Sequence, residues 1–379
     1  MNQYTYNSGE FRVGKARGNR HTTSKIINDT KVSSIAIACS ILLLAIITCV
    51  FFVVFRDDFS LPTWDFTEWI PTATTTATNK GPILPTDKYY PYATNTNKTK
   101  FLADKGGVGL GGLTLSSEYA ILINVDDMTT LAHKNADTVI YPASMTKVMT
   151  VITALDYIED LDDVYVLTKQ VLKKVPDGAS VAALSIYLEE GQKNITVRDL
   201  LYGISYMSGA DSVVCLLDYF NLTVEEFASL MNKKAREIGL KNTSFGGAIG
   251  MDAEENRTTC RDMAAIMAYA MENEYAREFF SGGKHSLDII EGYSYYHSTL
   301  DTLLGRMYTS PSVLLGNYTI LAAKSGLEDK AGYCLVSYIQ NDSTGEHYVL
   351  VTANANRAEW PDAQNTIHDM VAIFDAIKP

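Results

Sequence analysis

The stretch Tyr141–Thr150 reads YPASMTKVMT and lies between two apolar segments. Before it, Ala120–Val125 is rich in β-branched residues, which predicts a strand. After it, Val148–Ile158 is apolar with helical periodicity, which predicts a helix. Pro142 suits the entry to that helix, because its fixed φ is already helical and its missing N–H is not needed there. Ser144 is therefore expected in the first helical turn.

Ser144 and Lys147 are three residues apart, so on a helix their side chains share one face. A serine hydroxyl becomes a useful nucleophile when a neighbouring base takes its proton. Burial among Val148, Met149 and Val151 would lower the pKa of the Lys147 amine and let it act as that base. The helix N-terminus would also favour negative charge developing at Ser144.

The tetrapeptide alone allows a simpler interpretation, in which Ser144 caps the helix and Lys147 lies on the surface. A second S-x-x-K occurs at Ser281–Lys284, but Gly282 and Gly283 do not favour the start of a helix. We therefore discount the second match.

Length and charge limit the classes of function. A chain of 379 residues allows one large domain or two. The net charge is −12, but residues 1–32 carry six basic and two acidic residues, so the remainder is −16 (−12 minus 4). An acidic body argues against nucleic acid as a partner. The five cysteines and six histidines show no metal-ligand spacing, so we expect no metal site.

The N-terminal region predicts a membrane anchor. Residues 33–55 form a run of 23 residues without a charge, long enough to span a bilayer. The basic flank precedes the run, so residues 1–32 are expected to be a cytoplasmic tail and the body extracytoplasmic. A buried core helix is the alternative. Residues 56–113, rich in Thr, Pro and Asn, are interpreted as a tether.

The globular body is expected at 114–379. A hairpin is predicted at 119–133, helices follow to about 280, strands occupy 318–324, 332–340 and 348–353, and a last helix covers 360–377. Thr196 is expected to cap one helix, and Thr223 with Glu226 to form a capping box. The order predicts an α+β fold (an α/β sandwich), with an antiparallel sheet covered by helices on both faces and a helical subdomain.

Two further motifs follow the Ser/Lys pair. Ser208-Gly209-Ala210 occurs 64 residues after Ser144, in a loop expected between two helices. Lys324-Ser325-Gly326 occurs 116 residues later, at the expected end of an apolar strand. A lysine and a hydroxyl there can bind a carboxylate, and a glycine lets a substrate backbone approach the strand.

Together these motifs closely resemble the D-alanyl-D-alanine carboxypeptidase family, the low-molecular-weight penicillin-binding proteins, whose motifs are S-x-x-K, S-x-N and K-T-G. The resemblance extends over about 114–379. Further matching stretches are Val197–Gly203, Gly239–Phe245, Thr258–Tyr269 and Asp329–Val336. The resemblance implies a β-lactamase/DD-peptidase-like fold, preceded here by one transmembrane helix.

The resemblance also implies roles for individual residues. Ser144 would be acylated, Lys147 would be its base, and Ser208 would help relay the proton. Lys324 and Ser325 of the Lys324–Gly326 motif would hold the terminal carboxylate of a peptidoglycan stem peptide ending in D-Ala-D-Ala. The backbone N–H groups of Ser144 and Leu327 would form the oxyanion hole. No cofactor would be needed, and β-lactams would acylate the same serine.

Two departures from the family pattern keep alternatives open. Ala210 stands where the second motif has asparagine, and the segment 299–304 lacks the basic residue expected there. The leading hypothesis is a membrane-anchored serine carboxypeptidase that removes the terminal D-alanine. The alternatives are a catalytically weak module that binds penicillin or peptidoglycan, and a β-lactamase. The β-lactamase is less favoured, because no E-x-x-L-N segment supplies a water-activating glutamate.

Overall fold

The computed structural model describes residues 88, 90–182, 184, 193–286, 294–295, 315–355 and 364–377. The chain divides into two units, residues 1–75 and 76–379, and every described residue belongs to the second. Three segments discussed above lie outside the described residues. They are the predicted tail (1–32), the predicted membrane span (33–55) and the segment 299–304, which differs from the family pattern. Within the described ranges, no helix is both long and apolar enough to cross a membrane.

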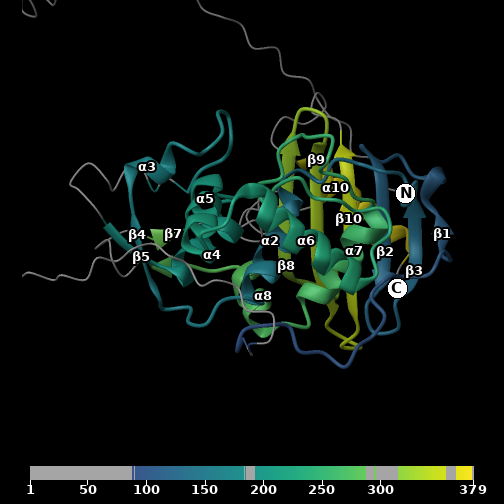
Figure 1. The fold of residues 1–379 in the computed structure, drawn as a ribbon. Coiled ribbons are helices and arrows are strands. Elements are labelled where there is room, and N and C mark those ends of the chain that lie inside the picture. Colours follow the sequence, from purple (N-terminus) through teal and green to yellow (C-terminus); the bar gives the residue numbers. More distant parts are fainter. Residues whose placement is uncertain are drawn as a thin grey trace, which may run out of the picture. The chain divides into compact units, whose positions relative to one another are not determined.

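Six strands form the main sheet, in the order β1-β3-β2-β10-β9-β8 (Figure 1). Their bounds are Val108–Gly109 (β1), Ser117–Asn124 (β2), Thr129–Lys134 (β3), Tyr318–Glu328 (β8), Gly332–Asn341 (β9) and His347–Ala355 (β10). Four pairs are antiparallel and β1 pairs with β3 in parallel. The sheet is therefore mixed rather than purely antiparallel as predicted, because the short β1 comes from a segment interpreted as tether.

Strand alternation divides the core into two layers. In β2, Ile121 and Ile123 face one cluster of buried residues, whereas Ala120 and Leu122 face the other. A period of two is what a strand imposes on side chains that point to opposite faces. Each cluster also contains buried helix residues, so helices cover both faces of the sheet, as the sequence predicted.

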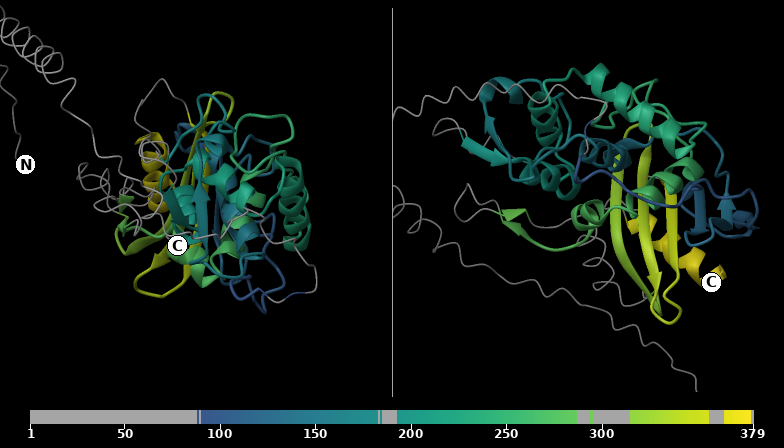
Figure 2. Two further views of the ribbon diagram at one scale, coloured as in Figure 1. Left: turned by 60° about the vertical axis from the view of Figure 1, so that its left-hand side comes forward. Right: turned by 60° about the horizontal axis from the view of Figure 1, so that its bottom comes forward.

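Different helices of the described part of the chain cover the two faces of the sheet. The first face packs against α2 (Thr146–Leu155) and α7 (Cys260–Ala270), with α6 (Val224–Ile238) beside them. The other face packs against α10 (Gln364–Ile377), whose Ile367, Met370 and Phe374 are buried. Figure 2 shows α10 separated from the other helices by the strands. The result is a three-layer arrangement.

A smaller, mainly helical part adjoins the sheet beside β8, at the left of Figure 1. It comprises β4 (Val164–Leu167), α3 (Lys169–Leu172), β5 (Lys193–Thr196), α4 (Val197–Tyr206), α5 (Ala210–Tyr219), α8 (Glu274–Phe280), β6 (His285–Ser286) and β7 (Ser294–Tyr295). This arrangement agrees with the predicted helical subdomain. Its α4–α5 junction carries the second sequence motif.

The predicted helix caps are confirmed. The Thr196 hydroxyl accepts the Asp199 N–H and the Asp199 carboxylate accepts the Thr196 N–H, which forms a full capping box at α4. Thr223 and Glu226 do the same at α6. Gly239 ends α6 in the left-handed region with φ 91°, a conformation that glycine adopts without steric cost.

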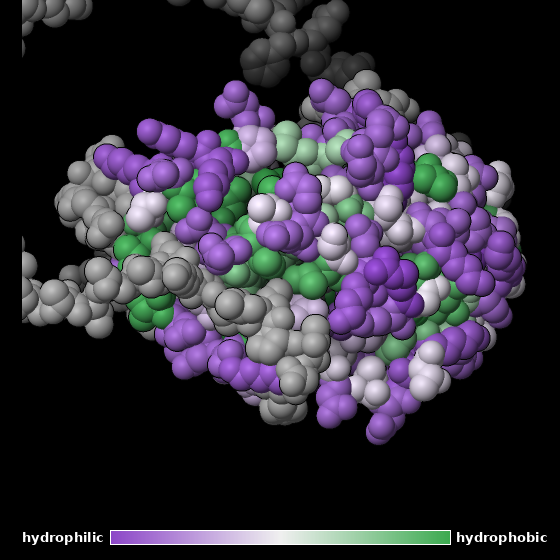
Figure 3. Space-filling view, viewed as in Figure 1, coloured by the Kyte–Doolittle hydropathy of each residue, from purple (hydrophilic) through white to green (hydrophobic). Residues whose placement is uncertain are grey.

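On the face seen in Figure 1, hydrophilic side chains cover most of the surface around α6 and α7 (Figure 3).

The structure corrects two predicted boundaries. Tyr90, Phe101 and Leu110 are buried against the body, so the packed region begins near residue 90 instead of at 114. β8 continues to Glu328, so Lys324-Ser325-Gly326 lies inside a strand and not at its end. Pairing with β9 outweighs the weak strand propensity of these residues.

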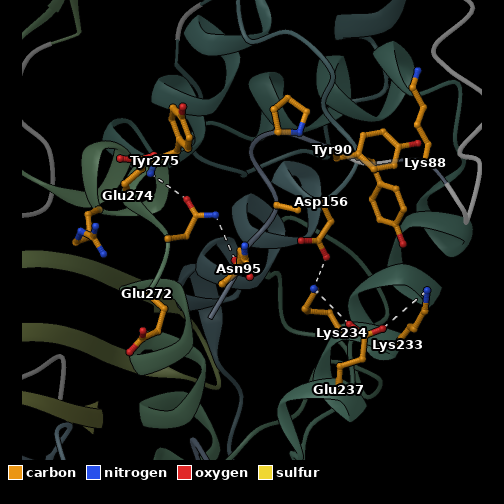
Figure 4. Close-up of a pocket in the computed structure, with 16 residues that line it drawn as sticks. Lys88, Tyr90, Asn95, Asp156, Lys233, Lys234, Glu237, Glu272, Glu274 and Tyr275 are labelled. Carbon is orange, nitrogen blue, oxygen red and sulfur yellow. Dashed lines mark hydrogen bonds and ion pairs between the residues drawn. The ribbon is translucent and has the colours of Figure 1, made fainter. Parts of the chain in front are cut away.

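A polar cavity of about 730 Å³ lies between the 88–95 segment, the end of α2 and α6 (Figure 4). Lys234 pairs there with Asp156, and their side chains are only 8% and 16% exposed. The neighbouring Lys233 pairs with Glu237, but both side chains are about half exposed. Four cationic and four acidic side chains line the cavity, so their formal charges cancel.

We expect Lys234→Met to lower the free energy of unfolding by about 3 kcal/mol, because it leaves Asp156 buried without its partner. Lys233→Met, on the same helix, should cost no more than about 0.5 kcal/mol, because exposed pairs contribute little. Urea denaturation of both variants measures the difference. Equal losses would show that the Lys234–Asp156 pair is not the stabilising contact.

Candidate active site

The backbone around Ser144 forms a short 3-10 turn, η3 (Ala143–Met145), that leads directly into α2. Ser144 therefore lies just before the α-helix and not within its first turn as predicted. Ala143 has φ 48°, in the left-handed region that residues with a Cβ rarely adopt. Such strain persists where the surroundings enforce it, and it often marks a functional site.

The loop after Phe245 enforces this turn. A Cβ on Gly250 would overlap the carbonyl oxygen of Ala143, so only glycine fits there, and its φ is 89°. Two successive carbonyls of the same loop accept hydrogen bonds from α2. Ala248 O accepts from the Thr150 hydroxyl at 2.7 Å and Ile249 O accepts from Lys147 at 2.6 Å. The loop is thus fixed along the helix that carries Lys147.

Lys147 lies between Ser144 and this loop. Its Nζ is 3.0 Å from the Ser144 Oγ, and its side chain is 1% exposed. Burial lowers the pKa of Lys147 to about 7, although the charges of Glu328 and Asp211 oppose the shift. A neutral amine there can donate one N–H to Ile249 O and accept the serine proton on its lone pair.

The third motif lies against the same turn. A Cβ on Gly326 would come 3.1 Å from the Ser144 backbone nitrogen and 2.8 Å from the Ala143 Cβ, so β8 touches the turn at a residue without a side chain. Lys324 is 1% exposed and donates to Ser325 O at 2.9 Å. Burial and the nearby Lys147 charge hold the pKa of Lys324 well below its usual range. Ser325 and Leu327 alternate onto the opposite, exposed face of β8.

The second motif occupies a tight turn between α4 and α5. Ser208 has φ 56°, and its Oγ is buried without a hydrogen-bond partner among the described residues. Gly209 packs so closely on Ala182 that a Cβ would overlap it, and Ala210 is fully buried. Among the described residues, the Ser208 hydroxyl therefore makes no hydrogen bond to Lys147. Asp211, at the start of α5, carries a charge that opposes the lowering of the Lys147 pKa.

Sequence reasoning missed three contributors to this geometry. Asp211 accepts from Ala182 N at 2.7 Å and Leu184 N at 3.0 Å, which fixes the chain that covers Ala210. The role of the Ile249 carbonyl has no signature in the sequence, because every residue has a backbone carbonyl. The glycines of the loop 246–250 indicated a close backbone approach at Gly250, but the sequence did not show that this approach is to Ala143. No group of described residues is arranged to hold a metal ion.

Comparison with known proteins identifies the family of the chain. A family model described as D-alanyl-D-alanine carboxypeptidase, peptidase S11, matches residues 110–356. The chain belongs to the D-alanyl-D-alanine carboxypeptidase family. The curated relatives include DacF of Bacillus subtilis, 33% identical over 177 residues (47% of this chain and 44% of DacF), and DacA of Escherichia coli, 29% identical over 236 residues (59% and 53%). The chain thus spans about half the length of these relatives.

Solved structures of the family have the same fold. A mutant of Streptomyces K15 DD-transpeptidase superposes with a TM-score of 0.56 at 26% identity, covering 69% of this chain and 99% of that one. Penicillin-binding protein D2 of Listeria monocytogenes, in its cefotaxime-bound form, gives a TM-score of 0.55 at 26% identity, covering 69% and 98%. The fold is therefore DD-peptidase/β-lactamase-like.

A serine-directed fluorophosphonate should label Ser144 at a rate that rises with pH through a midpoint of about 7, because the Lys147 amine must be neutral to accept the proton. Lys147→Met should nearly abolish labelling. Peptide mapping by mass spectrometry over about pH 5 to about 9 measures both effects. The matched control is Lys284→Met in the second S-x-x-K, where Ser281 ends α8, and it should change nothing. A pH-independent rate would contradict the assignment of Lys147 as base.

Gly326→Ala should slow labelling of Ser144 by roughly 100-fold, because the added methyl displaces β8 or the Ser144 turn by a fraction of an ångström. Gly112→Ala is the matched control, since no atom lies within 4 Å of a Cβ there. Labelling rates of the two variants, with circular dichroism to confirm folding, make the comparison. Equal rates would show that close contact at Gly326 is not required.

Proposed function

We propose that the protein is a membrane-anchored serine-type D-Ala-D-Ala carboxypeptidase that trims peptidoglycan stem peptides. The observation that carries the proposal is the buried amine of Lys147 at 3.0 Å from the Ser144 hydroxyl, with a pKa lowered to about 7. Family membership supports the substrate class. Residues 33–55 would be the anchor, with residues 1–32 cytoplasmic and the catalytic domain outside the membrane.

The chemistry would begin with proton transfer from Ser144 to the neutral Lys147. The serine oxygen attacks the carbonyl carbon of the penultimate D-alanine, and the oxyanion forms between the N–H groups of Ser144 and Leu327. The proton passes to the leaving nitrogen, with Ser208 in the relay, and the terminal D-alanine departs. Water then hydrolyses the acyl-enzyme and regenerates Ser144.

The two buried lysines would have different roles, with Lys324 binding the substrate carboxylate and Lys147 acting as the base. Lys324 and Lys147 are close enough that the charge of one disfavours the charge of the other. The terminal carboxylate of a stem peptide would favour the charged form of Lys324, with Ser325 as a second donor. Lys147 would then stay neutral, which is the state required of the base.

The proposal is tested by incubating the full chain, in detergent, with a peptide ending in D-Ala-D-Ala and measuring released D-alanine. Ser144→Ala should reduce release by at least about 1,000-fold, because it removes the nucleophile. A labelled penicillin should give a covalent adduct that maps to Ser144. Release by Ser144→Ala as fast as by the parent would exclude the proposed mechanism.

The second candidate is a weak penicillin- or peptidoglycan-binding module, and the fully buried Ala210 favours it. An asparagine amide at this position could hydrogen-bond to a substrate, whereas a methyl group cannot. In the same experiment, stem-peptide binding without D-alanine release or a penicillin adduct would identify the module. Rapid turnover of the penicillin would indicate a β-lactamase instead.

A further inference from the structure

Beside the Ser144 turn, three charged residues converge on the ring of Tyr141. The Arg257 guanidinium lies 3.7 Å and the Lys330 ammonium 5.1 Å from the ring centroid, both within cation–π distance. The Tyr141 hydroxyl donates to Glu254 at 2.8 Å and accepts from Arg257 at 2.8 Å. Lys330 also contacts Glu254 at 3.3 Å. We call Tyr141, Glu254, Arg257 and Lys330 the tyrosine cluster.

The members of the tyrosine cluster come from three segments that the site must hold together. Tyr141 immediately precedes the Pro142–Ser144 backbone. Lys330 lies in the β8–β9 turn, four residues after Gly326. Glu254 and Arg257 belong to the loop whose Ile249 carbonyl binds Lys147. The cluster therefore connects the nucleophile turn, the substrate strand and the loop that binds the base.

A second bond strengthens the link between the loop and the β8–β9 turn. The Lys330 backbone N–H donates to the Asp252 carboxylate at 2.6 Å. Arg257 is itself fixed, since its side chain is 19% exposed, its guanidinium donates to Ala253 O at 2.7 Å, and its backbone pairs with Ser244. Arg257 is thus a rigid support, and Lys330 is the residue that it holds through Tyr141.

The end of β8 needs such support. β8 pairs with β9 on one side as far as Glu328, but it is an edge strand, and no described strand pairs with its outer side. At Gly326 it meets the Ser144 turn without a side chain, so that contact limits how close the strand comes but does not hold it there. Leu327, whose N–H is proposed for the oxyanion hole, lies between Gly326 and Lys330. A shift of a fraction of an ångström at such donors slows the chemical step.

We propose that Arg257 and Lys330, acting through Tyr141, are positioning residues that hold the end of β8 against the Ser144 turn and so fix the spacing of the two oxyanion-hole N–H groups. This inference rests on the proposed carboxypeptidase function. It assigns to the cluster an effect on the transition state, in which the oxyanion forms, rather than on binding of the stem peptide. A cluster with a merely structural role would instead lower stability and leave the kinetics unchanged.

The kinetic test compares Arg257→Met and Lys330→Met with the control Arg198→Met. Arg198 is a similar arginine, 28% exposed and paired with Asp162 at 3.0 Å, but it lies at the start of α4. We expect kcat for D-alanine release to fall about 10-fold in both cluster variants, with KM changed less than about 2-fold. Arg257→Lys, which keeps a cation beside the ring, should recover kcat to within about 3-fold of the parent.

Urea unfolding of the same variants identifies a purely structural effect. The proposal fails if Arg257→Met and Arg198→Met lose the same kcat, or if kcat of Arg257→Met stays within about 2-fold of the parent. It also fails if the loss appears in KM alone. A larger kcat loss in Arg257→Met at a stability loss equal to that of Arg198→Met supports it.

Amide hydrogen exchange separates this inference from the proposed function. In the peptide covering residues 325–330, exchange should become about 10-fold faster in Arg257→Met and stay unchanged in Arg198→Met. If the parent releases no D-alanine and takes up no penicillin, the proposed function fails, but the exchange result still decides whether the cluster holds β8. Unchanged exchange in Arg257→Met would overturn the inference.

Discussion

The site depends on the burial of one amine. Lys147 is 1% exposed, and its Nζ has two described partners, the Ser144 hydroxyl and the Ile249 carbonyl. Lowering a lysine pKa to about 7 corresponds to roughly 5 kcal/mol of preference for the neutral form relative to water. Neither partner carries a charge that would offset this preference. The fold therefore keeps at the nucleophile a base that loses its charge at about pH 7, far below the pH at which a lysine in water does.

The rest of the structure maintains that burial from three sides. The loop 246–250 lies along α2, because Thr150 and Lys147 bind successive carbonyls. β8 packs on the η3 turn and meets it at Gly326, and α4 packs on α2. The charges of Glu328 and Asp211 raise the pKa of Lys147, and the larger effect of desolvation lowers it. Removing the Glu328 charge would therefore lower the pKa of Lys147 further.

Local patterns predicted those parts of the molecule that depend on nearby residues. The capping boxes at Thr196 and Thr223 follow from side chains three positions apart, and the hairpin at β2–β3 follows from two apolar segments separated by a short polar turn segment. The spacing of Ser144 and Lys147 predicted that their side chains meet. The positive φ of Ala143 and the role of the Ile249 carbonyl could not be predicted, because each depends on a loop about 100 residues away. The same holds for β8, whose final residues are strand because β9 pairs with them.

The pair of buried lysines constrains which ligands the proposed site can accept. Lys324 is 1% exposed, and both its burial and the neighbouring Lys147 charge disfavour its protonation. A neutral ligand would leave Lys324 uncharged and gain only an ordinary hydrogen bond from it. A ligand with a terminal carboxylate would favour uptake of a proton from solvent by Lys324 and gain a charge-assisted bond in a site sheltered from water, which is about twice as strong. The charge gained by Lys324 would also hold Lys147 neutral, so binding of the correct substrate class would itself prepare the base.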